Sequence, residues 1–124
     1  MLSLPRLRHV LLGAALSSLA AVTLLAAKAE HVERLLATGS CARCDLYEAS
    51  LVRLKAPGAD LSGATLVRAN LYYADLQGAN FSGALLDEAD LRAANLKGAT
   101  GAVLTNSKTD SRTTCPSGFK GPCR

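Results

Sequence analysis

The residues of this 124-residue chain that are best suited to chemistry are its four cysteines: Cys41, Cys44, Cys115 and Cys123. Thiols can form disulfides, bind zinc or carry a redox activity. Cys41 and Cys44 have CxxC spacing, and Arg43 places a cation beside them, whereas seven residues separate the other two cysteines. A c-type haem needs histidine directly after CxxC, and Asp45 stands there instead, which excludes haem attachment.

No other group of residues forms a catalytic pattern. There is no Ser/His/Asp or Cys/His arrangement and no phosphate-binding loop, and we interpret His31 as a surface residue of a cap. Asp45, Asp60, Asp75 and Asp90 occupy one position of a repeat and are expected to face water. The sequence therefore predicts no catalytic residues, no metal site and no cofactor.

Residues 1–29 have the features of a secretory signal peptide. Arg6 and Arg8 form a basic start, residues 10–27 are apolar without a charge, and Ala27-Lys28-Ala29 fits a cleavage site. We expect a mature chain from Glu30 that is exported, and an even number of cysteines behind such a leader favours disulfides. The alternative is an uncleaved membrane anchor over residues 10–27, whose length is at the lower limit for a bilayer span.

The charge of the chain does not indicate a nucleic-acid partner. The formal net charge of +4 includes Arg6, Arg8 and Lys28, and without them 11 basic and 10 acidic residues remain. Nucleic-acid-binding proteins usually gather their basic residues on one face, whereas here the signs alternate along the chain.

A tandem repeat must position the cysteines. From Cys44 to Gly98 the chain divides into eleven pentads, most with a small first residue and a central Leu or Phe. A period of five fits neither a helix nor a strand but is typical of a solenoid, whose coils bury their apolar side chains against one another. The first and central residues, two apart, are expected to point inward. In Leu54–Gly58 the inward pair is kept with its order reversed, Leu54 first and Ala56 central.

This pattern resembles the pentapeptide repeat family, whose signature is A(D/N)LXX. The resemblance implies an all-β solenoid, a right-handed quadrilateral β-helix of nearly three coils with four pentads, or 20 residues, in each. Residues 20 apart should then stack. The implied stacks are Glu48–Arg68–Glu88, Lys55–Asp75 and Tyr72–Arg92.

The resemblance also bears on location and activity. Family members with a leader and a cysteine-bearing tail are familiar from bacteria, so we expect a periplasmic or secreted bacterial protein, with inner-membrane anchoring by residues 10–27 as the alternative. DNA mimicry directed at gyrase, the best known activity of the family, needs a long acidic column in the cytoplasm. A short, nearly neutral, exported chain does not fit that activity.

The repeat needs a cap at each end. Residues 30–43 are expected to form a short helix (30–37) and the CxxC entry, and residues 99–124 an irregular cap with a further pentad at 102–106. If each cysteine pair stays at its own end of the column, the natural pairing is Cys41–Cys44 and Cys115–Cys123. Zinc binding and a redox-active CxxC remain open at this point.

Two of the four expected faces carry side chains suited to binding. The other two carry mainly Gly, Ser and Gln. Our hypothesis is a non-enzymatic exported scaffold that binds a protein or an envelope component through the outer faces. The alternatives are that these side chains only stack between coils, or that the protein is a CxxC-dependent redox or zinc-binding envelope protein. The candidate interaction residues are Tyr47, Arg53, Arg68, Tyr72, Tyr73 and Arg92.

Overall fold

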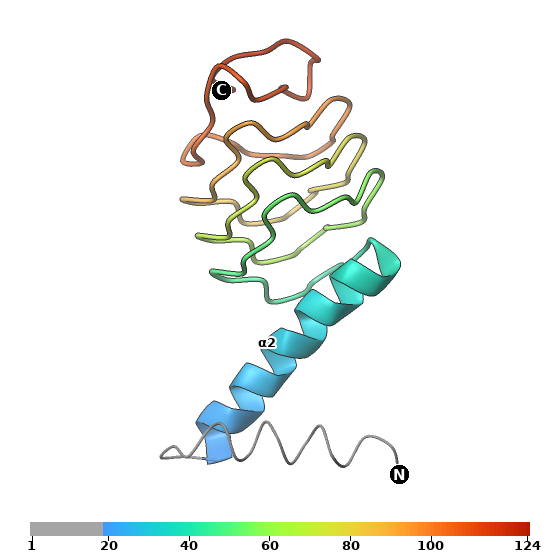
Figure 1. Cartoon of the computed structure of the whole chain (residues 1–124), viewed down its shortest axis with the longest axis vertical. Helices are drawn as coiled ribbons and strands as arrows, with labels where there is room; N and C mark the ends of the chain where they lie inside the picture. The colour runs from blue at the N-terminus through green and yellow to red at the C-terminus, as the bar shows by residue number, and fades with distance from the viewer. Residues whose placement is uncertain (1–18) are drawn as a thin grey trace. The chain divides into compact units, whose positions relative to one another are not determined.

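The computed structural model describes residues 19–124, which comprise a helix and a column of stacked coils (Figure 1). The chain divides into two compact units, residues 1–30 and 31–124. Most of the predicted signal peptide, and the start of the alternative anchor, lie outside the described residues. In residues 19–124, no helix combines the length and the apolar character that crossing a membrane requires.

The only helix among the described residues is α2, Leu19–Thr38, which is longer than predicted at its N-terminal end. Its first half is rich in Leu and Ala, which favour helix, so the helix does not begin at the acidic residue Glu30. It ends as expected before Gly39, which has a φ of 72° and whose N–H donates to the Leu35 carbonyl at 2.8 Å.

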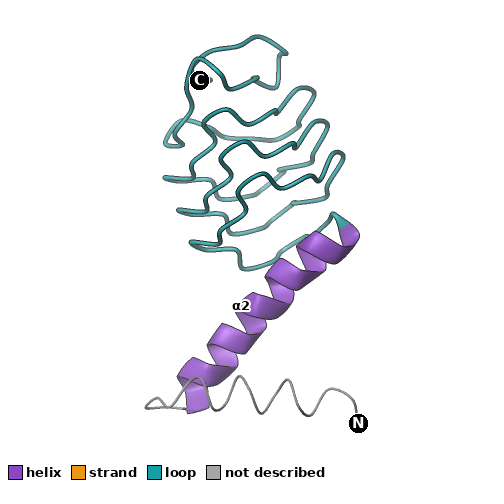
Figure 2. Ribbon diagram, viewed as in Figure 1, coloured by secondary structure: helices purple, strands orange, loops and turns teal. Residues whose placement is uncertain are grey.

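The column consists of single parallel bridges rather than long strands, so no strand is drawn among residues 19–124 (Figure 2). Asp45 pairs with Thr65, and Thr65 pairs in turn with Leu85, at a spacing of 20 residues. The N–H of Leu46 donates to the Thr65 carbonyl at 2.8 Å, and the same bond recurs around the coil. This is the register that four pentads per coil require.

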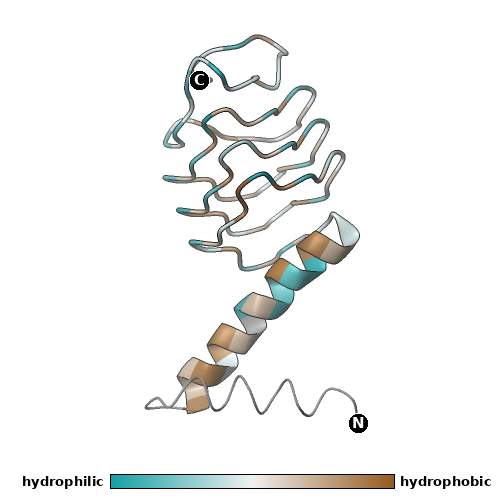
Figure 3. Ribbon diagram, viewed as in Figure 1, coloured by the Kyte–Doolittle hydropathy of each residue, from teal (hydrophilic) through white to brown (hydrophobic). Residues whose placement is uncertain are grey.

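The first and central residues of the pentads form the core. All eleven central residues are at most 2% exposed, and Leu54 and Ala56 both point inward as predicted. Hydrophobic and hydrophilic residues consequently follow one another along each coil (Figure 3). The fully buried central residues include Leu61, Leu66, Leu71, Leu76, Phe81, Leu91 and Leu96.

The chain turns at a left-handed corner every five residues. At the first corner of the repeat, the Ala49 N–H donates to the Leu46 carbonyl at 3.1 Å, which closes a β-turn. The fifth residue of every pentad has a positive φ, a conformation that favours glycine. Two corner lines use mainly glycine, and the other two use Glu48, Arg68 and Glu88, and Arg53, Tyr73 and Ala93.

Coil stacking extends beyond residues 44–98 in both directions. Before the repeat, the Cys41 and Arg43 N–H groups donate to carbonyls of the next coil, Asp60 at 2.8 Å and Ser62 at 2.7 Å. After it, Asp90 bridges Lys108 and Asn95 bridges Thr114, pairs separated by 18 and 19 residues. The last coil is therefore one or two residues shorter than the others.

The last turns of α2 supply groups that complete the first coil. Inside the column the Thr65 N–H donates to the Cys44 carbonyl, but the equivalent Asp45 N–H donates to His31 Nδ1 at 2.9 Å. Similarly, the Asp60 N–H donates to Ser40 Oγ at 2.9 Å. Leu35 is completely buried. His31 thus satisfies a backbone donor that would otherwise lack a partner.

Gly101 provides a test of the short last coil. Its φ is 68°, and a Cβ atom there would lie 2.7 Å from the Ser82 Cα and N atoms. Gly101→Ala should lower the free energy of unfolding by about 3 kcal/mol, since a backbone clash adds to the left-handed penalty. Chemical denaturation would measure it.

Gly78→Ala is the matched control, because Gly78 has a φ of 71° but no atom within 4 Å of the added Cβ. It should cost about 1 kcal/mol. Equal losses for the two variants would show that coils do not pack closely at Gly101.

Candidate functional site

The first part of the candidate surface is a line of charges in which Arg68 links two coils. Its Nε donates to Glu88 Oε2 at 2.9 Å, and Nη1 lies 3.5 Å from Glu48 Oε1 and 3.4 Å from the Tyr47 hydroxyl. The predicted charge stack is therefore present. The hydrogen bond to Glu88 raises the pKa of Arg68 above its usual range. Because all three charged side chains are more than half exposed, these ion pairs add little stability.

The second part is an aromatic cluster around Tyr72 and Tyr73. Their ring centroids are 4.7 Å apart at an interplanar angle of 87°. Arg92 lies over Tyr72 at 5.9 Å, in the predicted stack. Arg112 lies 5.5 and 5.6 Å from the Tyr72 and Tyr73 rings, and its Nη1 donates to both hydroxyls at 3.2 and 3.4 Å. Sequence analysis missed Arg112, although positions 72, 92 and 112 continue the 20-residue spacing.

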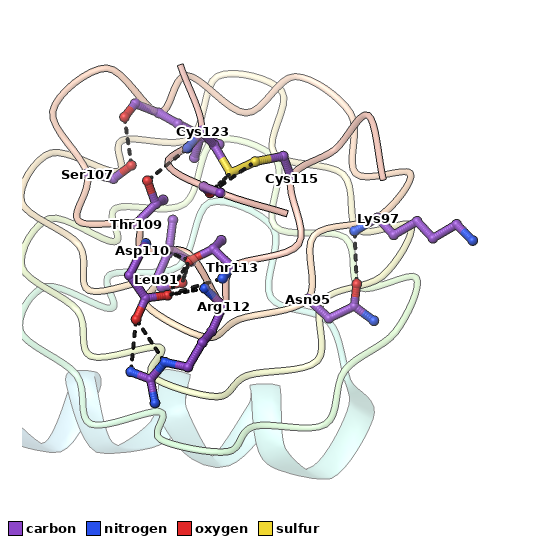
Figure 4. Close-up of a disulfide and its surroundings, with 12 residues drawn as sticks. Leu91, Asn95, Lys97, Ser107, Thr109, Asp110, Arg112, Thr113, Cys115 and Cys123 are labelled. Carbon is purple, nitrogen blue, oxygen red and sulfur yellow. Dashed lines mark hydrogen bonds and ion pairs between the residues drawn. A yellow bond between two sulfur atoms is a disulfide. The ribbon is translucent and has the colours of Figure 1, made fainter. Parts of the chain in front are cut away.

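Asp110 holds Arg112 in place. Its Oδ1 accepts the backbone N–H groups of Ala93, Arg112 and Thr113 at 3.0, 3.0 and 3.1 Å. Its Oδ2 accepts Nη2 of Arg112 at 2.8 Å (Figure 4). Burial tends to raise the pKa of Asp110, but the hydrogen bonds from Arg112, Ala93 and Thr113 outweigh burial and hold that pKa well below its usual range. The buried Thr113 hydroxyl completes this network by donating to the Leu91 carbonyl at 3.1 Å.

Arg53 completes the set on the corner line of Tyr73. It has a φ of 58° and an exposed side chain. Its guanidinium makes no hydrogen bond or ion pair with any residue in the described part of the chain. The structure thus brings Tyr47 and Arg68 together in one group and Tyr72, Tyr73 and Arg92 in a second.

The cysteines form two disulfides, Cys41–Cys44 and Cys115–Cys123, in the pairing expected from the sequence. Cys41 occupies a central inward position and Cys44 the first position of the next pentad, so the CxxC segment is one corner of the column. The Cys44 N–H donates to the Cys41 carbonyl at 3.3 Å, as at the other corners. Both cysteines are only 1% exposed, so neither sulfur is available to a redox partner.

No metal-ligating cluster supplements the cysteines. Among residues 19–124, no three His, Cys, Asp or Glu side chains come together in a way that could hold a metal ion. The Arg34 guanidinium lies 3.9 Å from the Cys44 sulfur, which is the closest polar contact of that disulfide to α2.

Comparison with known proteins identifies the family. The profile for pentapeptide repeats, with eight copies, matches residues 44–83 and 66–106. The chain therefore belongs to the pentapeptide repeat family, whose members adopt a right-handed quadrilateral β-helix. No curated protein matches the sequence.

Solved structures support the same assignment. A pentapeptide repeat protein from Nostoc Pcc 7120 is 33% identical with a TM-score of 0.52, over 74% of this chain and 83% of that one. One from the cyanobacterium Cyanothece 51142 is 31% identical with a TM-score of 0.40, over 61% of this chain and 56% of that one. One from the Arabidopsis thaliana thylakoid lumen is 27% identical with a TM-score of 0.41, over 60% and 57%.

Asp110 predicts how the column responds to acid. Because its folded-state pKa lies below the ordinary value of 3.8, the stability it contributes is present above that value and is lost as pH falls through the folded pKa. The melting temperature of the wild type should fall on acidification below about pH 4. Asp110→Asn should melt lower at pH 7 and show a shallower acid dependence. An unchanged acid dependence in this variant would contradict the role given to Asp110.

The positions of Cys41 and Cys44 predict which substitutions they tolerate. Cys41→Leu with Cys44→Ala restores the inward pair of the other pentads, so this variant should fold and melt independently of reductant. Cys41→Ser with Cys44→Ser buries two hydroxyl groups and should be about 3 kcal/mol less stable. Thermal melts with and without reductant would compare them. If both variants unfold equally, the inward-corner assignment is wrong.

Proposed function

We propose that this protein is a non-enzymatic, exported scaffold that binds a protein or an envelope component through two adjacent faces of its column. The binding surface consists of the charged line and the aromatic cluster described above. Arg112 extends that surface beyond the residues expected from sequence. Membership of the pentapeptide repeat family supports the scaffold part of this proposal.

One observation carries the proposal: the choice of residue at the left-handed corners. Gly58, Gly78 and Gly98 occupy one corner line, where glycine adopts a positive φ without strain. Charged or aromatic residues take five of the six positions on the two binding lines, with φ between 55° and 58°. Arg43, at the entry to the column, is the one non-glycine corner elsewhere in residues 19–124.

The energies do not favour these residues as stabilisers. A left-handed conformation costs a non-glycine residue about 1 kcal/mol or more. The three residues of the charged line thus cost about 3 kcal/mol, whereas two exposed ion pairs return at most about 2 kcal/mol. Strain kept at a surface is typical of functional positions. Tyr and Arg are also the residues most enriched at binding hot spots.

The alternative, a CxxC-dependent redox or zinc protein, is not favoured. All four cysteines are oxidised in two disulfides, and no free cysteine occurs in residues 19–124. The first pair occupies inward corner positions, and the second pair belongs to the other end of the column. A zinc site would require breaking both disulfides and bringing the two ends together.

Glycine substitution tests the proposal directly. Arg68→Gly and Tyr73→Gly relieve corner strain while removing the side chains offered for binding. We expect the free energy of unfolding of each variant to stay within about 1 kcal/mol of wild type. Capture of the partner by the tagged protein in its own cells should be lost.

Gln77→Ser and Lys55→Ser on another face are matched controls that should retain capture. A loss of 3 kcal/mol or more in the glycine variants would mean that the side chains serve the column, and the proposal would fail. Unchanged capture by stable glycine variants would also contradict it.

A further inference from the structure

The C-terminal end of the column differs in charge from the rest. Between residues 30 and 96, nine acidic residues outnumber six basic ones. From residue 97 onward, five basic residues accompany one acidic residue, Asp110, which is already engaged with Arg112. The chain thus has a basic end, an asymmetry typical of contact with a polyanionic surface. The five basic residues are Lys97, Lys108, Arg112, Lys120 and Arg124.

A constrained loop presents an aromatic side chain at this end. The Cys115–Cys123 disulfide closes the loop, and the Cys115 N–H donates to the Phe119 carbonyl at 2.8 Å. Thr114 bridges Lys120 in antiparallel fashion. Although its backbone is held, the Phe119 side chain is 78% exposed. A rigid loop that exposes a large apolar group loses little conformational entropy on binding.

Cations and further apolar groups surround this aromatic ring. Phe119, Lys120 and Arg124 line one hollow of about 460 Å³, whose floor includes Ala102 and Leu104. Val103, between those two residues, is 69% exposed. Lys97 lies beside the loop, since its Cγ would be 3.9 Å from a Cβ on Gly118.

The cations at this end remain available. The side chains of Lys97, Lys120 and Arg124 make no hydrogen bond or ion pair with another described residue, in contrast to the Arg112 side chain. Isolated lysines act as mobile point charges suited to a diffuse anionic surface, whereas paired arginines suit a defined protein epitope. Separate protruding apolar side chains also suit an acyl-chain boundary better than a flat protein surface.

We propose that this end of the column binds the surface of a membrane rich in anionic phospholipid. Phe119 and Val103 enter the boundary between headgroups and acyl chains, and the three free cations contact lipid phosphates. This contact is independent of the lateral binding faces and of any N-terminal anchor. It places the column against the membrane while leaving the lateral faces accessible to a partner.

The absence of tryptophan from the sequence allows a local test in the full chain. In Phe119→Trp, fluorescence reports on the loop alone, whatever the N-terminal segment does. Vesicles of phosphatidylglycerol and phosphatidylcholine should shift this emission to shorter wavelength, and brominated lipid should quench it. Pure phosphatidylcholine vesicles should have no effect. Adding Lys120→Gln to this variant should weaken the response about fivefold, and high salt should abolish it.

Leu85→Trp is the matched control, because Leu85 is 52% exposed on the side of the column. Its emission should not change with either vesicle. Emission from position 119 that is insensitive to anionic vesicles would overturn the proposal. A shift produced by soluble polyglutamate but not by vesicles would also overturn it, and would assign the end to an acidic protein partner.

Discussion

The left-handed corner at every fifth residue is the constraint on which the rest of this structure depends. It bends the chain so that positions one and three of each pentad face inward and coils align at 20 residues. The register in turn places side chains above one another and creates the lines that form the outer faces. A single backbone conformation, repeated, thus determines both the core and the surface.

A column made in this way has an unsatisfied end at each terminus, and the structure completes both with side chains. His31 and Ser40 accept backbone N–H groups at the first coil, and Asp110 accepts that of Ala93 near the last one. A disulfide accompanies each set. The CxxC segment fits here because residues i and i+3 of a corner both point inward. Its spacing therefore reflects corner geometry rather than thiol chemistry.

The period of five was enough to predict the family, the inward pair, the 20-residue register and three stacks, because each follows from local repetition. It was not enough to predict the extent of stacking. The pentad containing Cys41 lacks the Ala-Leu signature, and the last coil omits one or two residues, which hides the pairing of Lys108 and Thr114. The role of Asp110 depends on contacts between distant segments, which no local pattern encodes.

The central claim is that the charged and aromatic corner side chains are kept for recognition, at a cost to the column. Site-specific photo-crosslinking in the native cells tests it most directly, with the crosslinker placed at Tyr73 and, for comparison, at Gln77 on another face. The account predicts one discrete crosslinked partner from position 73 and none from position 77. No crosslink at position 73, or the same products from both positions, would contradict it.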